Sequence, residues 1–284
     1  MKNLLRQSAA PFLLWSLLAC QPSASIEPLA MNDALKQDIA ELQSKRIFFG
    51  HQSVGGNIIE GVEDLLASSG KQLNLIEAGV DADTAAPLPS NFLLHMPIGK
   101  NSEPKTKCDD FRRMIDQELA GKVDVALLKF CYVDIDDNSD VDALFAYYRS
   151  VLDGLKARHP DITFIHVTAA LRHSEGGFGV WIRETLGKPN RSKLANIKRN
   201  QFNDMLRETY AEDPIFDLAA SESTYPDGRR ETFEYDGKTS YGMIGAYTYD
   251  GGHLNEAGRQ YVAAAFIQSI ARSAATDAAV ATRQ

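Results

Sequence analysis

The feature that most constrains this chain of 284 residues is the alternation of short apolar segments with longer segments of helical periodicity. Apolar runs of strand length are expected to form strands at 46–50, 73–77, 123–130, 162–168 and 215–218. Apolar residues at spacings of three and four predict helices at 33–44, 54–69, 109–120, 141–158, 192–210 and 255–271. Strands joined by helices form βαβ units with right-handed crossovers. The chain is therefore predicted to be an α/β protein with a mostly parallel, five-stranded sheet covered by helices on both faces.

Composition narrows the class of protein further. Apolar residues make up 44% of the chain and charged residues 24%, and the mean hydropathy is -0.26; these values exclude a multi-span membrane protein, a collagen-like repeat and a disordered chain. The formal net charge of -8 argues against a general nucleic-acid binder, because such a protein needs a positive surface to displace counterions from phosphates. No interior linker is found, so we expect one domain over 32–273 and a frayed tail over 274–284.

The N-terminus has the pattern of an export signal. Lys2 and Arg6 precede an apolar run over 9–19, which is too short to cross a bilayer because a spanning helix takes roughly 20 apolar residues. A positive segment followed by a short apolar segment is typical of a secretory signal peptide. Residues 1–19 are therefore predicted to be removed on export.

The end of that apolar run resembles the lipobox of bacterial lipoproteins, in which cleavage precedes a cysteine that then carries the lipid. Cys20 is accordingly predicted to be lipidated, and 20–31 to form a tether. Gln21 follows the cysteine where an inner-membrane retention signal would have Asp, which favours an anchor in the outer membrane facing the periplasm or the cell surface. Plain secretion with cleavage elsewhere is the alternative.

Two further cysteines, Cys108 and Cys131, have two interpretations. In an oxidising compartment they can pair as a disulfide. They can also remain separate buried thiols, since Cys131 ends an apolar run and has the character of a small core residue.

Ser53 stands where the first expected strand turns into its helix. A serine here can simply cap the helix N-terminus. It can also be a nucleophile presented at the sheet edge, with helix N–H groups nearby to receive negative charge. A Walker A phosphate loop is excluded: Gly50 and Gly55 are spaced correctly, but Gly56-Asn57 replace the required Lys and Ser/Thr.

The second chemical pattern is Asp250-Gly251-Gly252-His253, directly before the last expected helix. A carboxylate three residues before a histidine can reach one imidazole nitrogen and so fix its tautomer. The alternative is a glycine-rich turn with a surface histidine. No second histidine lies at ligand spacing, so no metal site is predicted. Doubly wound topology can bring Ser53 and His253 to the same sheet edge, where the long loops 79–107, 169–191 and 219–252 also lie.

Together, Gly50-His51-Gln52-Ser53 and Asp250-Gly251-Gly252-His253-Leu254 resemble the first and last motif blocks of the SGNH/GDSL hydrolase superfamily. The resemblance covers about 45 to 272 and implies that family's three-layer, doubly wound, flavodoxin-like fold. It implies that Ser53 is the nucleophile, that His253 is the general base and acid, and that Asp250 is the carboxylate that orients His253.

The oxyanion hole of that family uses the N–H of the serine, a glycine after the second strand and an asparagine after the third. Gly79 matches the glycine. After the third expected strand the chain reads Lys129-Phe130-Cys131-Tyr132, without the asparagine. Lys129, Tyr132 or a backbone N–H is expected to replace it, or the activity is weakened, since losing one donor costs roughly 10²–10³ in rate. The alternative for Lys129 and Tyr132 is an ion pair and a packed ring. His51 is expected to line the pocket.

The resemblance implies a serine esterase acting on a small-molecule or glycan ester, without a metal or an organic cofactor. The predicted export favours O-acetyl groups of an envelope or extracellular polysaccharide as the substrate. Two alternatives stay open: an acyltransferase that uses the same three residues on a glycan, and a non-catalytic glycan-binding lipoprotein.

Other polar and aromatic residues receive structural roles. His166 lies within a strand pattern and is expected to be a satisfied core residue, and Asp217 is expected to anchor a loop. The aromatic and basic residues of 221–249 are expected either to stack on a sugar or to pack on one another. These residues are Tyr225, Arg229, Arg230, Phe233, Tyr235, Tyr241, Tyr247 and Tyr249.

Overall fold

The structure is a computed structural model that describes residues 26–79, 88–174, 186, 188 and 190–281, with side chains described up to residue 273. The predicted signal peptide and the predicted lipid attachment site Cys20 lie outside the described residues. None of the helices within these ranges combines the length and the apolar character needed to cross a membrane.

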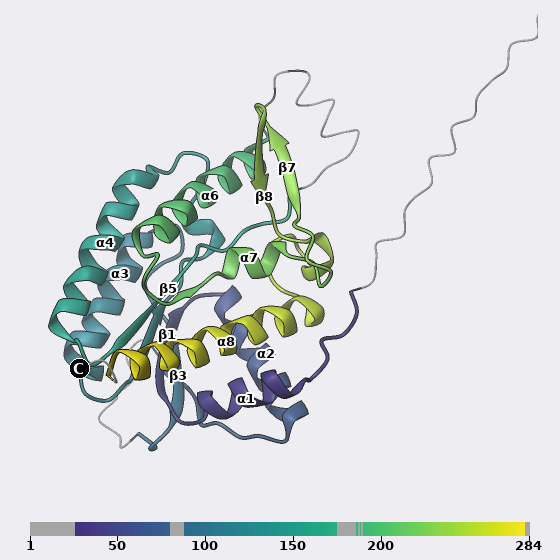
Figure 1. Cartoon of the computed structure of the whole chain (residues 1–284). Coiled ribbons are helices and arrows are strands. Elements are labelled where there is room, and N and C mark those ends of the chain that lie inside the picture. Colours follow the sequence, from purple (N-terminus) through teal and green to yellow (C-terminus); the bar gives the residue numbers. More distant parts are fainter. Residues whose placement is uncertain (1–25, 80–87, 175–185, 187, 189, 282–284) are drawn as a thin grey trace, which may run out of the picture.

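A six-stranded parallel sheet forms the centre of the molecule, with the strand order β2-β3-β1-β4-β5-β6 (Figure 1). Its central strands are buried on both faces, as expected where helices cover a parallel sheet. The strands are β1 (Arg46–His51), β2 (Leu75–Glu77), β3 (Phe92–Pro97), β4 (Val125–Leu128), β5 (Thr163–Val167) and β6 (Ile215–Phe216).

Helices pack on both faces of this sheet and give three layers (Figure 1). On one face, α3, α4 and α6 pack on side chains such as Phe48 and Leu128. On the other face, α1, α2 and α8 pack on side chains such as Phe49 and Leu127. The predicted α/β fold is confirmed. The helices are α1 (Asp33–Leu42), α2 (Val54–Ser69), α3 (Pro104–Arg113), η1 (Met114–Leu119), η2 (Tyr132–Asp134), α4 (Val141–Arg158), α6 (Arg191–Thr209), α7 (Leu218–Ser223), η3 (Gly245–Tyr247) and α8 (Glu256–Ala281).

The sheet has one strand more than the five predicted. The additional strand, β3, lies within the stretch 79–107, for which its Pro, Asp and Asn residues predicted irregular structure. Its first five residues are buried, and it pairs with β1 so that His95 lies opposite Phe49. Consequently β3, and not β2, is the direct neighbour of β1, and β2 is an edge strand.

Two more differences concern the C-terminal third. The long stretch 219–252 contains most of α7 and an antiparallel hairpin of β7 (Thr232–Tyr235) and β8 (Lys238–Tyr241). Helix α8 continues to Ala281, through most of the tail that was expected to fray. The tail is rich in alanine, which has the highest helix propensity of all residues.

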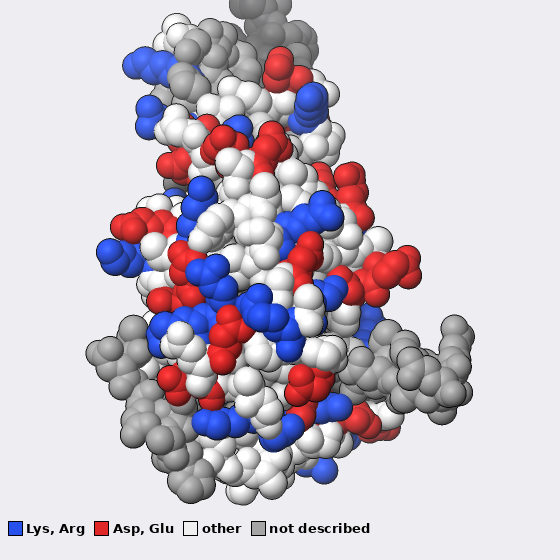
Figure 2. Space-filling view, turned by 90° about the vertical axis from the view of Figure 1, so that its left-hand side faces the viewer, with Lys and Arg blue, Asp and Glu red and all other residues white. Residues whose placement is uncertain are grey.

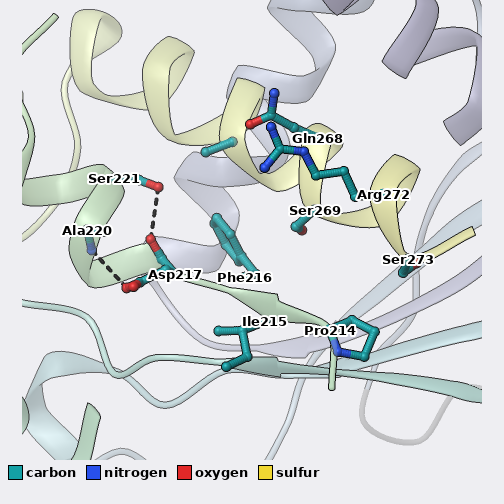
Figure 3. A pocket seen from close by; sticks show the side chains of 11 residues that line it. Pro214, Ile215, Phe216, Asp217, Ala220, Ser221, Gln268, Ser269, Arg272 and Ser273 are labelled. Carbon is teal, nitrogen blue, oxygen red and sulfur yellow. Dashed lines mark hydrogen bonds between the residues drawn. The ribbon is translucent and has the colours of Figure 1, made fainter. Parts of the chain in front are cut away.

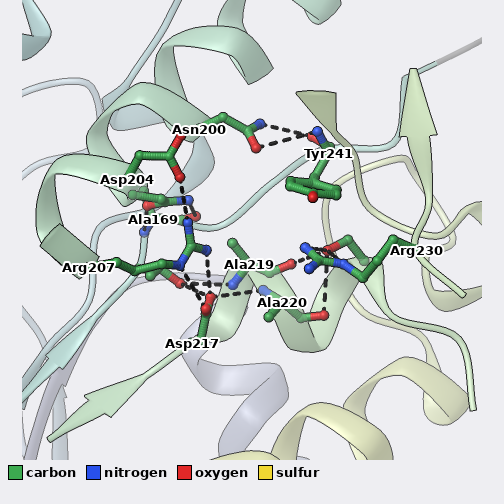
Figure 4. Close-up of polar contacts among 12 residues, drawn as sticks. Ala169, Asn200, Asp204, Arg207, Asp217, Ala219, Ala220, Arg230 and Tyr241 are labelled. Carbon is green, nitrogen blue, oxygen red and sulfur yellow. Dashed lines mark hydrogen bonds and ion pairs between the residues drawn. The ribbon is translucent and has the colours of Figure 1, made fainter. Parts of the chain in front are cut away.

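Asp217 anchors the chain where β6 gives way to α7 (Figure 4). Its carboxylate accepts the N–H of Ala220 at 3.0 Å and forms an ion pair with Arg207 at 2.8 Å. Near the other end of α7, the guanidinium of Arg230 lies 3.9 Å from the centroid of the Tyr241 ring and donates to the Ser223 hydroxyl. These contacts agree with the anchoring role expected for Asp217, and they show that part of the aromatic and basic segment packs on itself.

The surface over α3 and α4 mixes charges of both signs (Figure 2). Three basic residues of this region are paired with nearby carboxylates: Arg112 with Asp109, Arg149 with Asp153, and Arg158 with Asp116. Exposed pairs of this kind contribute little to stability, typically about 0–1 kcal/mol each. Their importance here is that they break up the charge of this face into small alternating areas.

Helices α2 and α8 contact each other closely, and this contact matters for the site described below. A Cβ atom on Gly61 of α2 would lie 2.4 Å from the carbonyl oxygen of Arg259 in α8. The Arg259 side chain in turn pairs with Asp64 at 2.8 Å and with Glu60 at 3.1 Å. The two helices that begin beside Ser53 and His253 are therefore held in one relative position.

Candidate active site

Ser53 connects β1 to α2 at the carboxyl edge of the sheet and has an unusual backbone conformation, with φ 44° and ψ -100°. A non-glycine residue at positive φ is strained and persists only where its surroundings enforce it. One such restraint is the neighbouring Gln52, whose amide donates to the carbonyl oxygens of Ile98 at 3.1 Å and Gly99 at 3.0 Å. The Ser53 side chain makes no capping bond to its helix, so the structure does not show the capping role.

Instead, Ser53 Oγ forms a hydrogen bond with Nε2 of His253, although the two residues are 200 positions apart. The other imidazole nitrogen, Nδ1, lies 2.6 Å from Oδ2 of Asp250. The His253 side chain is 28% exposed and that of Asp250 41% exposed, so the group is open to solvent and to a ligand. The structure thus brings Ser53, His253 and Asp250 into one hydrogen-bonded chain.

The surroundings of Asp250 stabilise the charged form of its carboxylate, which can then pair with an imidazolium. Its Oδ1 accepts the main-chain N–H groups of Gly252 at 2.9 Å and His253 at 2.7 Å. Burial is the largest single influence on this carboxyl group and acts to raise its pKa. Together, the hydrogen bonds from the His253 ring and from the two N–H groups outweigh the effect of burial. They hold the pKa of Asp250 well below its usual range. Asp250 is therefore ionised at neutral pH.

The His253 ring lies between two aromatic side chains. Tyr132, from η2 after β4, meets it edge-on with ring centroids 5.7 Å apart, and Tyr249 lies nearly parallel to it with centroids 5.9 Å apart. Tyr132 packs so closely on Gly252 that a Cβ there would lie 2.7 Å from the ring. Arg172, after β5, donates to the carbonyl oxygens of Asp250 and Gly251. Loops from three parts of the chain therefore orient the imidazole.

The start of α2 offers hydrogen-bond donors beside the serine. As expected for the first turn of a helix, the N–H groups of Ser53 and Val54 meet no acceptor in the part of the chain that the structure describes. The positive end of the helix dipole lies at the same place. A hydroxyl, an imidazole, a carboxylate and main-chain N–H donors thus lie together, an arrangement that can support acyl transfer.

Gly79, the predicted oxyanion glycine, lies away from this arrangement. It follows β2, which β3 separates from β1. The glycine that follows the direct neighbour of β1 is Gly99, but its N–H donates to Asp110 Oδ2 at 2.8 Å. The expectation for Gly79 assumed a sheet in which β2 is the direct neighbour of β1. Because β3 lies between these strands, Gly79 follows an edge strand instead.

Lys129 does not reach the nucleophile either. Its side chain is fully buried, and its ammonium group lies 3.9 Å from Sγ of Cys131. Among the described residues its ammonium has no hydrogen bond to Ser53 or His253. Cys131 and Cys108 are free, buried thiols, and burial raises the pKa of Cys108 to about 12. Of the two interpretations, the structure therefore shows separate core cysteines.

His51 belongs to the interior beneath the nucleophile. It is 5% exposed, and its Nε2 lies 3.1 Å from Nδ1 of His95 in β3. Burial first, and then the charges of His95 and Lys129, lower the pKa of His51 to about 3, so its imidazole is neutral. We expected His51 to line the pocket, but it packs inside. His166 is likewise buried, as expected for a core residue, with Nδ1 2.8 Å from the Tyr148 hydroxyl. Its Nε2 lies 3.5 Å from Asp213 Oδ2 and makes no hydrogen bond among the described residues, so the ring, contrary to the expectation, is not fully satisfied.

Three supporting residues were not identified from the sequence: Gln52, Arg172 and Asn57. The side chain of Asn57, in the first turn of α2, accepts the N–H of Leu254 at 3.2 Å and so ties the histidine loop to the serine helix. Its partner is 197 positions away, and no short-range pattern predicts such a contact.

The cavities of the molecule do not change this assignment. One of about 330 Å³ lies between β6, α7 and α8, and none of the residues of the Ser53 site borders it (Figure 3). The Asp217 carboxylate on its wall is already occupied by Arg207 and the α7 N-terminus. Within the described ranges, no group of three or more His, Cys, Asp or Glu residues is arranged to hold a metal ion.

Comparison with known proteins gave matches among solved structures only; no family model and no curated protein matches the chain. An acetyl xylan esterase is 18% identical over 78% of this chain and 98% of its own, with a TM-score of 0.44. A lipase/acylhydrolase from Enterococcus faecalis is 15% identical over 80% and 96%, with a TM-score of 0.41. The periplasmic domain of a lipopolysaccharide acetyltransferase from Salmonella ser. Paratyphi A is 10% identical over 82% and 87%, with a TM-score of 0.41.

Proposed function

We propose that this protein is a serine esterase of the SGNH/GDSL type, which cleaves an acyl ester through Ser53, His253 and Asp250. One observation supports the proposal above all others: the hydrogen-bonded chain from Ser53 Oγ through the His253 ring to the Asp250 carboxylate. A serine that only capped α2 would need neither this chain nor a strained backbone with φ 44°.

In the proposed reaction, Ser53 Oγ attacks the ester carbonyl carbon while Nε2 of His253 takes the hydroxyl proton. Asp250 stabilises the imidazolium that forms. The N–H groups of Ser53 and Val54 hold the negative oxygen of the tetrahedral intermediate. The intermediate collapses, His253 returns its proton to the leaving alcohol, and an acyl-serine remains. A water molecule activated by His253 then releases the acid and restores Ser53.

The test compares the wild type with Ser53→Ala on p-nitrophenyl acetate. We expect the variant to lose about 10³-fold or more in kcat, since the nucleophile and its partners act as a unit. Ser68→Ala, an exposed serine on the same helix, serves as the control for folding and purification. A fluorophosphonate probe should label the wild type, with the adduct mapped to Ser53 by mass spectrometry. Equal rates for wild type and Ser53→Ala would refute the proposed esterase activity and favour the alternative of a non-catalytic glycan-binding protein.

For the substrate, we propose O-acetyl groups of an envelope or extracellular polysaccharide. Acetate release from an O-acetylated glycan, measured with and without an unacetylated acceptor glycan, tests this. Free acetate in both cases indicates a hydrolase, whereas acetylated acceptor at the expense of free acetate indicates an acyltransferase. No acetate from any O-acetylated glycan would exclude this substrate class.

For the location, we propose a lipid anchor on Cys20 that holds the protein at the outer membrane. Growth of expressing bacteria with an alkyne-labelled fatty acid should label the wild type but not Cys20→Ala, and the wild type should fractionate with outer membranes. An unlabelled wild type would indicate secretion without an anchor.

A further inference from the structure

Tyr249 lies beside His253, the proposed base, and its side chain is unusually open. It is 68% exposed, and in the described part of the chain Leu186 is the other large hydrophobic residue exposed to this degree. Single apolar residues on a surface are common, so exposure by itself says little. The informative features are where the Tyr249 ring lies and how firmly its loop is held.

The ring lies directly beside the catalytic imidazole. Its plane is inclined by only 12° to that of His253, with 5.9 Å between the centroids. His253 also bonds Ser53 Oγ, so the imidazole links the tyrosine to the proposed nucleophile. Tyr132, the other aromatic partner of His253, is partly buried against Gly252 and Arg172, and so it belongs to the packing of the loop.

The loop that carries Tyr249 is rigidly bonded on both sides of it. The Thr248 hydroxyl accepts the N–H groups of Asp250 at 3.3 Å and Gly251 at 2.9 Å. The carbonyl of Gly251 accepts the N–H of His173 at 2.9 Å. These bonds hold the main chain of the loop, and the ring itself lies nearly parallel to that of His253, so less entropy is lost when a ligand binds.

The surroundings of the ring favour a sugar over a long acyl chain. An acyl chain needs continuous apolar surface, but the described residues around this position are polar or charged: Thr248 and Asp250 flank Tyr249 in the chain, and Arg172 donates to the Asp250 carbonyl. A sugar ring presents an apolar C–H face, which can cover an aromatic ring, and hydroxyls at its rim, which can bond such neighbours. Building on the proposed esterase function, we propose that Tyr249 is the platform on which the sugar ring of an O-acyl carbohydrate stacks, with the acylated hydroxyl beside Ser53.

The first experiment measures kcat and KM on two acetate esters, a partially O-acetylated xylo-oligosaccharide and ethyl acetate, which has no ring. For Tyr249→Ala, the ratio of kcat/KM on the oligosaccharide to that on ethyl acetate should fall about tenfold, mainly through KM, since aromatic stacking contributes up to about one factor of ten. Tyr249→Trp should keep the ratio. Tyr147→Ala, a partly exposed tyrosine on α4, is the matched control and should keep it as well. An equal loss on both esters would overturn the proposal.

The second experiment separates the platform from the chemistry. Saturation-transfer NMR measures binding of the unacetylated xylo-oligosaccharide to Ser53→Ala and to the double variant Ser53→Ala, Tyr249→Ala. The signal should be present in the first and lost in the second. Equal signals from the two variants would refute the proposed role of Tyr249, even if the wild type is an active esterase. If binding depends on Tyr249 but the wild type shows no esterase activity, only the proposed esterase function is refuted.

Discussion

At the scale of single residues, Asp250 determines how His253 behaves as a base. Its lowered pKa keeps it ionised at neutral and mildly acid pH, so the carboxylate stays available to stabilise the imidazolium that forms when His253 takes the proton of Ser53. Asp250→Asn should lower kcat by about 10²–10⁴-fold. A wild-type rate of Asp250→Asn on p-nitrophenyl acetate would exclude the proposed role of Asp250.

Asn57 offers a second test at this scale, because its side-chain oxygen accepts the N–H of Leu254, the residue after His253. Asn57→Leu removes the acceptor of the Leu254 N–H, whereas Asn57→Asp keeps an oxygen in its place. We expect Asn57→Leu to lower kcat by about tenfold, the equivalent of one net hydrogen bond, with little change in KM. Asn57→Asp should recover most of the rate. If both variants lose the same factor, the bond does not position His253.

At the scale of secondary-structure elements, the contact between α2 and α8 holds Ser53 and His253 together. A Cβ on Gly61 would meet the Arg259 carbonyl at 2.4 Å and the Ala263 side chain at 2.7 Å, so Gly61→Ala forces the helices apart. We expect this variant to lose about 1–3 kcal/mol in free energy of unfolding by urea and to lose esterase rate as well. Gly56→Ala is the matched control for stability, since a Cβ there meets nothing within 4 Å.

The control variant should be as stable as the wild type or slightly more stable, because alanine favours a helix over glycine. Gly61→Ala with wild-type stability and wild-type kcat would show that the helix crossing does not determine the geometry of the site.

At the scale of the whole molecule, buried histidines should make the fold sensitive to acid. Burial lowers the pKa of His51 to about 3 and of His166 to about 4, against 6.5 in the unfolded chain. Below pH 6.5 the unfolded chain therefore binds protons at these histidines, whereas the native protein does not. The free energy of unfolding falls by about 1.4 kcal/mol per pH unit for each histidine. Glu222, whose pKa burial raises to about 8, acts in the opposite direction and offsets one of them.

Urea unfolding at pH 6.5 and 4.5 checks this balance. The wild type should lose at least about 1.4 kcal/mol of unfolding free energy per pH unit, because burial also lowers the pKa of His95, and the loss of His166→Gln should be smaller by about 1.4 kcal/mol per pH unit. Equal slopes for the two proteins would mean that His166 takes up a proton in the native state.

The fold and the proposed triad could be predicted from sequence to different extents. Helical and strand periodicity depends on residues a few positions apart, and it located five of the six strands and the longer helices but not α7. It missed β3, because polar and proline-rich flanks hid an apolar run of only a few residues. The Ser53 and Asp250-Gly251-Gly252-His253 segments were recognisable because each contains its own chemistry within four or five residues.

The sequence by itself determined the α/β class and the two segments whose side chains form the hydrogen-bonded chain, since both follow from near neighbours. Only the tertiary structure decided the remaining placements: that Gly79 lies behind an additional strand, that Lys129 and His51 are interior, and that Asn57 reaches Leu254. Each of these depends on which distant segments become adjacent. Strand order and helix crossing determine which segments meet. Both depend on packing of the whole core, so no short stretch of sequence predicts them.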